Sequence, residues 1–206
     1  MRVFTRFLSS ALLFLAASGT AYAQDVPSPG QILEAWLASP HADSTTEAFR
    51  HWDSEGEIPG TCAVCHSTPG AVAYMSSPME TAGFIDHPVP LGTTVECDAC
   101  HSPGAQALTS VVFPSGVSVP VTGSSAVCSV CHQGRASTVQ VETAVAELGD
   151  DEVSPALGFI NIHYAAAAAT QLGGTVRGGY EYAGQSYVGS FQHIAGLDSC
   201  VSCHGA

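Results

Sequence analysis

The arrangement of apolar and polar positions is irregular along most of the chain, and few stretches keep a helical or strand period. Glycine and proline occur along its whole length, with 21 Gly and 12 Pro among 206 residues. Apolar positions on both sides of Pro114–Gly116 predict a β-hairpin over residues 111–119. A second hairpin is expected from Tyr180 to Phe191, with its turn at Ala183–Gly184.

The same pattern predicts only short helices. One is expected over Asp43–Trp52, with Asp43 or Ser44 as its N-cap. Another is expected over Thr138–Leu148, ended by Gly149, and the alanine run 165–169 favours a third. We therefore expect a mostly α fold with short β-hairpins, rich in loops and held together by something other than a conventional apolar core.

The N-terminal residues have the features of a secretory signal peptide. Arg2 and Arg6 give a positive start, Phe7–Ala17 is an apolar run too short to span a bilayer, and Ala21–Ala23 forms an A-x-A cleavage site. We therefore expect residues 1–23 to be removed and the protein to be exported, to the periplasm or the outside of the cell.

The mature chain, residues 24–206, has the length of one domain and is acidic. With 46% hydrophobic and 11% charged residues among its 206 residues, the full chain is neither a disordered polyelectrolyte nor a coiled coil. All five cationic side chains are arginines, and removing Arg2 and Arg6 changes the formal charge from −13 to −15. Such a charge excludes binding to nucleic acid or to anionic lipid by electrostatic attraction.

All eight cysteines fall in four Cys-x-x-Cys-His motifs. In this pattern two thiols add to the two vinyl groups of one haem, and the adjacent His is the proximal ligand of its iron. We therefore predict four covalent haem c groups, and the short intervals between the first three motifs lead us to expect successive haems to be neighbours. The attachment residues are Cys62, Cys65, Cys97, Cys100, Cys128, Cys131, Cys200 and Cys203, and the proximal ligands are His66, His101, His132 and His204.

Other uses of the cysteines explain the pattern less well. Four disulfides give no reason for a His to follow every second Cys. A zinc site needs a second pair of ligands, and a His next to a Cys is poorly placed for the same tetrahedron. A thioredoxin-like pair is expected once, on a βα unit, and not four times among Gly and Pro.

Five further histidines are enough to supply the sixth ligand of four irons. They are His41, His51, His87, His163 and His193. Met75 and Met79 are weaker candidates because they lie in a Ser/Pro-rich segment. His87 lies in a loop with Pro88 and Pro90, and we take it as the spare one. The predicted distal ligands are His41, His51, His163 and His193.

The order of motifs resembles that of exported multihaem c-type cytochromes of respiratory bacteria. The resemblance runs from His41 to the C-terminus, and it implies a fold organised around stacked haems with two His ligands each. Some such proteins are subunits of extracellular cytochrome filaments and borrow an axial His from a neighbouring subunit. Relatives commonly continue beyond the position of Ala206, so four haems is a minimum and the chain can be a truncated one. The segments that carry the resemblance are His41–Asp43, Glu47–Asp53, Cys62–Ser67, Cys131–Arg135, Asn161–Tyr164, Gly178–Tyr182 and the fourth motif.

The expected function is electron transfer and not catalysis, because two imidazoles on each iron leave no position for a substrate. Redox partner proteins or extracellular electron acceptors are the expected partners, with self-assembly as a further possibility. His41 and His51 either fold back onto the first two haems of their own chain or reach a neighbour's haem in a filament. A reductase with one open haem is a third alternative. Arg135, three residues after His132, is a candidate partner for a haem propionate or for a carboxylate of the protein.

Overall fold

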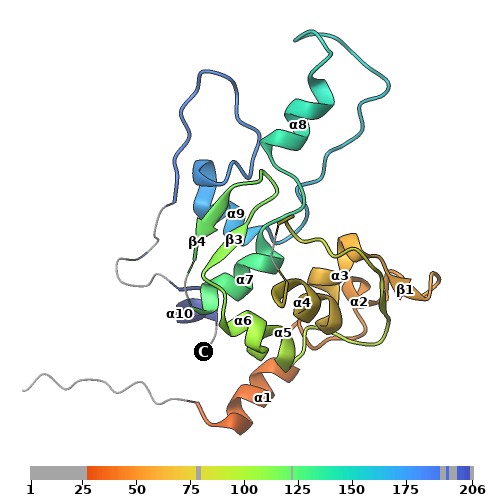
Figure 1. The fold of residues 1–206 in the computed structure, drawn as a ribbon, viewed down its shortest axis with the longest axis vertical. Coiled ribbons are helices and arrows are strands. Elements are labelled where there is room, and N and C mark those ends of the chain that lie inside the picture. Colours follow the sequence, from red (N-terminus) through yellow and green to blue (C-terminus); the bar gives the residue numbers. More distant parts are fainter. Residues whose placement is uncertain (1–26, 78–79, 122, 191–193, 195–198, 205–206) are drawn as a thin grey trace, which may run out of the picture.

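The computed structural model describes residues 27–77, 80–121, 123–190, 194 and 199–204 (Figure 1). The expected signal peptide and the candidate ligand His193 lie outside the described residues. The described part is mostly helical with two short antiparallel strand pairs, so the predicted fold class is confirmed. The elements are α1 (Pro29–Leu37), α2 (Glu47–Arg50), β1 (Glu57–Ile58), α3 (Gly60–His66), α4 (Thr68–Met75), β2 (Val89–Pro90), α5 (Cys97–His101), α6 (Pro103–Gln106), β3 (Ser110–Val112), β4 (Ser118–Pro120), α7 (Ser124–His132), α8 (Thr138–Val145), α9 (Ala167–Leu172), the 3-10 helix η1 (Gly173–Thr175) and α10 (Val201–His204).

Helices α3 and α4 pack closely through the residue that joins them. The Ser67 hydroxyl donates to the Ala63 carbonyl (2.8 Å) and accepts from the Gly70 N–H (3.0 Å), so one side chain ends α3 and caps α4. Pro69 lies in the first turn of α4, where no N–H is needed. A Cβ on Gly70 would lie 2.2 Å from the Ala63 carbonyl oxygen, so only glycine permits this approach.

The predicted hairpin over residues 111–119 is confirmed. Strands β3 and β4 are antiparallel, and Val111 pairs with Val119. Their turn is closed by the Phe113 N–H, which donates to the Val117 carbonyl (2.9 Å), and Gly116 takes a φ of +82°. A second pair, β1 with β2, joins the approach to α3 to the loop before α5, and the sequence pattern does not reveal it.

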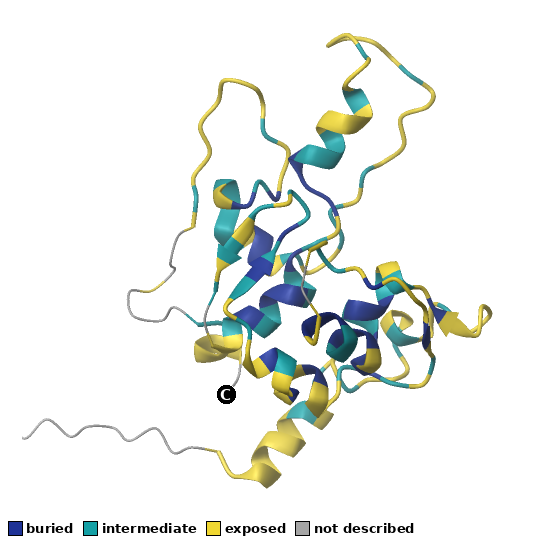
Figure 2. Ribbon diagram, viewed as in Figure 1, coloured by how far each residue is buried: buried dark blue, intermediate teal, exposed yellow. Residues whose placement is uncertain are grey.

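The apolar core is small and lies where α3, α4, α7 and β3 meet, which Figure 2 shows as the region of buried ribbon. Many large apolar side chains elsewhere are exposed, including Ile32 and Leu33 on α1, with 53% and 51% of their surface accessible. The polypeptide's own core leaves these side chains exposed. None of the described helices is both long enough and apolar enough to cross a membrane. The largest fully buried side chains are Phe113, Ile58, Gln133, Val64, Val111, Val130 and Val176.

The hairpin predicted from Tyr180 to Phe191 is wrong over its described residues, 180–190. The turn at Ala183–Gly184 forms, but no strand flanks it. The backbone that would have paired across the turn is bonded elsewhere, since the Gly174 N–H donates to the Val188 carbonyl (2.8 Å). The Tyr187 hydroxyl accepts from the Tyr182 N–H (2.7 Å), which also replaces a ladder bond.

Two predicted helices are shorter than the sequence suggests. The helix expected over residues 43–52 is limited to α2, because Asp43 caps a preceding turn by accepting from the Thr45 N–H (3.0 Å). The helix expected over residues 138–148 stops at Val145, and its N-terminus carries a capping box made by Ser137 and Gln140.

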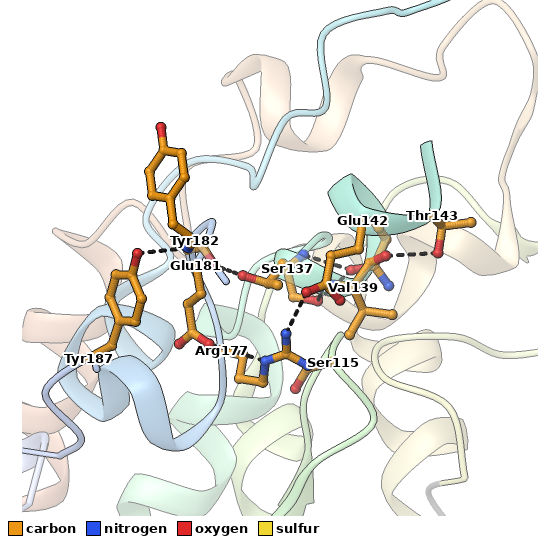
Figure 3. A network of polar contacts seen from close by, with 12 residues as sticks. Ser115, Ser137, Val139, Glu142, Thr143, Arg177, Glu181, Tyr182 and Tyr187 are labelled. Atoms are coloured by element: carbon orange, nitrogen blue, oxygen red, sulfur yellow. Dashed lines mark hydrogen bonds and ion pairs between the residues drawn. The ribbon is translucent and has the colours of Figure 1, made fainter. Parts of the chain in front are cut away.

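A polar network fixes the base of α8 against the segment after η1. Figure 3 shows Arg177 between two carboxylates, with nitrogen to oxygen distances of 2.9 Å to Glu142 and 3.1 Å to Glu181. The Thr138 N–H donates to the Arg177 carbonyl (3.1 Å), and the Thr138 hydroxyl donates to the Gly179 carbonyl. Arg177 holds a φ of +51° within this network.

Candidate haem-binding site

Each of the four motifs ends a short helix, and its His is the last helical residue of α3, α5, α7 or α10. Cysteines three positions apart on a helix share one face, so both thiols of a motif are presented to the same side. All eight cysteines are described and all carry free thiols, so the structure forms none of the disulfides considered as an alternative. Within the described residues no group of three or more His, Cys, Asp or Glu side chains could hold a metal ion directly.

The first and third motifs lie against each other, although the second motif separates them in the chain. The thiols of Cys65 and Cys131 are neighbours, and the Cys131 thiol donates to the Val64 carbonyl (3.7 Å). The neighbouring Cys65 thiol and burial raise the pKa of Cys131. The packing of α3 on α7 thus adds a contact between non-successive motifs to the expected proximity of successive ones.

The fourth motif also lies beside the third. The Cys200 N–H donates to the Ser125 hydroxyl (3.1 Å) at the start of α7, and the thiols of Cys200 and Cys128 are neighbours. Burial, together with the neighbouring thiols of Cys200 and Cys100, raises the pKa of Cys128 to about 11. The third motif is thus close to cysteines of each of the other three motifs.

Two of the predicted proximal histidines are held by backbone carbonyl groups. His66 Nδ1 lies 2.8 Å from the Ala48 carbonyl oxygen, and His132 Nδ1 lies 2.8 Å from the Ala165 carbonyl oxygen. A carbonyl only accepts, so Nδ1 carries the proton in both rings and Nε2 presents its lone pair. Metal-binding histidines have this arrangement, because the second-shell bond fixes both the tautomer and the ring orientation. Among the described residues, the rings of His101 and His204 have no comparable carbonyl partner.

Two of the predicted distal histidines face these proximal rings. The ring centroids of His41 and His132 are 6.2 Å apart, and those of His163 and His66 are 5.9 Å apart. Burial lowers the pKa of His41, His66 and His163 from its ordinary value, with neighbouring charges as smaller causes. This favours the neutral imidazole, which is the form that binds iron.

The other candidate ligands are placed differently. His51 is exposed at the end of α2, with its Nδ1 2.7 Å from Glu47 Oε1. The rings of His51 and Trp52 form a T-shaped pair with centroids 4.9 Å apart. His87 is exposed, beside Asp86 at 2.8 Å, on the wall of a shallow cavity of about 310 Å³. His193 lies outside the described residues, and all of these ligand assignments stay predictions.

Arg135 lies on the side of the first motif. Its positive charge lowers the pKa of Cys65, His66 and His163, although it is not the largest cause for any of them. Its guanidinium forms no ion pair with a described carboxylate. Both roles considered for Arg135 from the sequence, toward a propionate or a carboxylate, stay predictions.

The donor set fits covalently attached haem. Paired thiols on one helical face, a proximal imidazole with Nε2 presented, and a second imidazole opposite it are the features of a c-type haem site, and repeated motifs define the multihaem class. Residues 62–66 and 128–132 show all three features, together with His163 and His41 respectively.

Comparison with known proteins points to the same class. The chain is similar to the C-type polyheme cytochrome OmcB of two strains of Geobacter sulfurreducens, DL-1 / KN400 and ATCC 51573 / DSM 12127 / PCA, with 28% identity over 182 aligned positions in each case. The match covers 70% of this chain and only 23% of the relative's length. No family model and no solved structure matches. The similarity supports a multihaem c-type cytochrome and does not single out a subfamily.

Proposed function

We propose that this protein transfers electrons through four covalently attached haems, each with two axial histidines. The observation that carries the proposal is the repeated combination of a Nδ1–H held by a carbonyl and an imidazole facing the same ring, at His66 with His163 and at His132 with His41. Similarity to a polyhaem cytochrome supports it independently. The four proximal ligands are His66, His101, His132 and His204.

The haem group supplies the one-electron chemistry, and the protein supplies position, burial and charge. Thioether bonds from the cysteine pairs fix each ring to a helix end. Two imidazoles saturate the iron, so a change of oxidation state needs little movement and no substrate binds. Arg135 offers a positive charge beside the first motif, where a propionate carboxylate is stabilised by a guanidinium.

The proposed setting is anaerobic or extracellular respiration, with redox proteins or extracellular acceptors as partners. The signal-like residues 1–23 and the absence of lysine motivate this setting, since an acidic surface suits cationic partners and not nucleic acid.

The test uses protein produced in a host that matures c-type cytochromes. We expect an intact mass with four haem increments on the chain from residue 24, and a reduced spectrum that carbon monoxide barely changes. A mass with fewer haems would contradict the central proposal. One haem per chain that binds carbon monoxide would instead favour a reductase.

Self-assembly is a second candidate role, favoured by the placement of His51. Its Nδ1 is bonded to a carboxylate, its ring is exposed, and the ring of His66 already faces His163. An exposed histidine of this kind is suited to a haem of a neighbouring copy. If His51 binds a neighbouring copy, His51→Ala should reduce the particle size in solution and His87→Ala should not. Equal particle sizes for the two variants would contradict the self-assembly role.

A further inference from the structure

The two histidine ring pairs, His66 with His163 and His132 with His41, allow axial ligands to be assigned to individual haems. This assignment rests on the proposed function and goes beyond it. We propose that His163 is the sixth ligand of the haem bound by Cys62 and Cys65, and that His41 is the sixth ligand of the haem bound by Cys128 and Cys131. The ligands therefore cross: a residue after the third motif serves the first haem, and a residue before the first motif serves the third.

The centroid distances match two ligands on opposite sides of one iron. A metal–imidazole bond is about 2 Å long, and the ring centroid lies about 1 Å beyond the bonded nitrogen, so two trans rings have centroids roughly 6 Å apart. The observed values are 5.9 Å and 6.2 Å. The interplanar angles of 78° and 65° are compatible with this arrangement, because both ring planes contain the ligand axis at any rotation about it.

The segment of residues 161–165 holds both sites at once. Its residue His163 faces His66 of the first motif, and its residue Ala165 accepts the Nδ1 proton of His132 in the third motif. Both residues have positive φ, +87° and +52°, which non-glycine residues adopt rarely and mainly where the surroundings require it. Strain at two positions in one segment, each serving a haem motif, indicates that these conformations are held for ligation.

The loop after the third motif locks this segment in place. The Arg135 N–H donates to the Ile162 carbonyl (2.8 Å), and the His163 N–H donates to Asn161 Oδ1 (2.8 Å). Gly134 has a φ of +84°, and a Cβ there would lie 2.8 Å from the Ile162 carbonyl oxygen. Residues 134 and 135, which follow His132, thus fix the position of the His163 ring relative to the His66 ring.

His41 is anchored from the opposite side. Its carbonyl accepts from the Val95 N–H (3.2 Å), and the Val95 carbonyl accepts from the Trp36 indole N–H (2.9 Å). The His41 backbone is therefore bonded to Val95, just before the second motif, while the His41 ring faces His132 of the third motif. This placement differs from both sequence-based alternatives, because His41 stays in its own chain yet serves neither of the first two haems.

The test is a set of variants of the full chain, read by electron paramagnetic resonance and carbon monoxide difference spectra. His163→Ala and His41→Ala should each convert one haem per chain to a high-spin, ligand-binding form, and the double variant should convert two. His87→Ala is the matched control and should leave every haem as in the wild type.

Removing the first haem identifies which iron is opened. In a Cys62→Ala/Cys65→Ala background, His163→Ala should open no further haem, whereas His41→Ala should still open one. The assignment is overturned if His163→Ala leaves all haems low-spin, or if it opens a haem in that background. If the wild-type protein has four low-spin haems, the electron-transfer proposal stands even when one of these results overturns the ligand assignment.

A conservative replacement separates the loss of a ligand from a loss of folding. His163→Met should retain four haems and a six-coordinate first haem, now with a Met/His pair and a higher reduction potential. A spectrum unchanged from that of the wild type would also refute the assignment.

Discussion

The packing of Gly134 on the 161–165 segment can be tested by adding a single methyl group. In Gly134→Ala the new Cβ would lie 2.8 Å from the Ile162 carbonyl oxygen, 3.3 Å from Ile162 Cγ2 and 3.4 Å from the Ala166 Cβ. Gly116→Ala is a matched control, because Gly116 has almost the same φ, +82°, but no atom within 4 Å of an added Cβ. The difference between the two variants isolates the contact with the segment from the cost of positive φ.

The two costs can be estimated separately. A non-glycine residue at positive φ costs about 1–2 kcal/mol, which is the whole expected loss at Gly116. At Gly134, overpacking adds about 1–3 kcal/mol, and loss of the Arg135 to Ile162 hydrogen bond adds about 1 kcal/mol. We therefore expect Gly134→Ala to lower the free energy of unfolding by about 3–6 kcal/mol, against about 1–2 kcal/mol for the control.

Denaturant unfolding of the haem-loaded protein measures this difference, and the visible spectrum adds a second readout. If the segment positions His163, Gly134→Ala should also produce a high-spin fraction at one haem, and Gly116→Ala should produce none. Equal destabilisation by both variants would refute the packing argument. Full destabilisation without any spectral change would refute the link between the segment and the haem.

Three further predictions address other parts of the fold. Ser137→Ala removes the capping box of α8 and should destabilise that helix by about 0.5–2 kcal/mol, seen as faster amide exchange confined to residues 138–145. Thr143→Ala, at an exposed position of the same helix, leaves the capping box in place and should not. Trp36→Phe removes the indole bond to the Val95 carbonyl and should lower the free energy of unfolding by about 0.5–1.5 kcal/mol, while an unchanged unfolding midpoint would show that α1 does not support His41. Lowering the pH should destabilise the haem-loaded protein, because the native state needs the neutral imidazoles of His41 and His163, whose pKa values burial lowers. The unfolded state takes up protons on these rings as the pH falls through about 6.5, so the native state loses stability there. Stability that is flat from pH 7 to pH 5 would contradict this.

The haem motifs were readable from the sequence because the chemistry that defines them is contained within five residues. A pair of thiols and a histidine at fixed spacing need only one helical turn, and the structure provides that turn at all four motifs. The hairpin of β3 and β4 was also readable, since its alternating valines and the turn at Pro114–Gly116 are local signals. The hairpin predicted from Tyr180 failed because its backbone groups bond to η1 and to a tyrosine hydroxyl, and neither competitor is visible in a local pattern.

The sequence by itself determined four Cys-x-x-Cys-His motifs, from which the attachment cysteines, the proximal histidines and a set of candidate distal histidines were predicted. Only the tertiary structure decided which candidate meets which proximal ring. The partners of His66 and His132 lie far along the chain, and they are brought into place by the packing of α3 on α7, by the glycine at position 134 and by carbonyl groups of Ala48 and Ala165. Backbone carbonyl groups carry no side-chain signature, and a close approach depends on the summed path of many residues, so this part of the site could emerge only once the chain was folded.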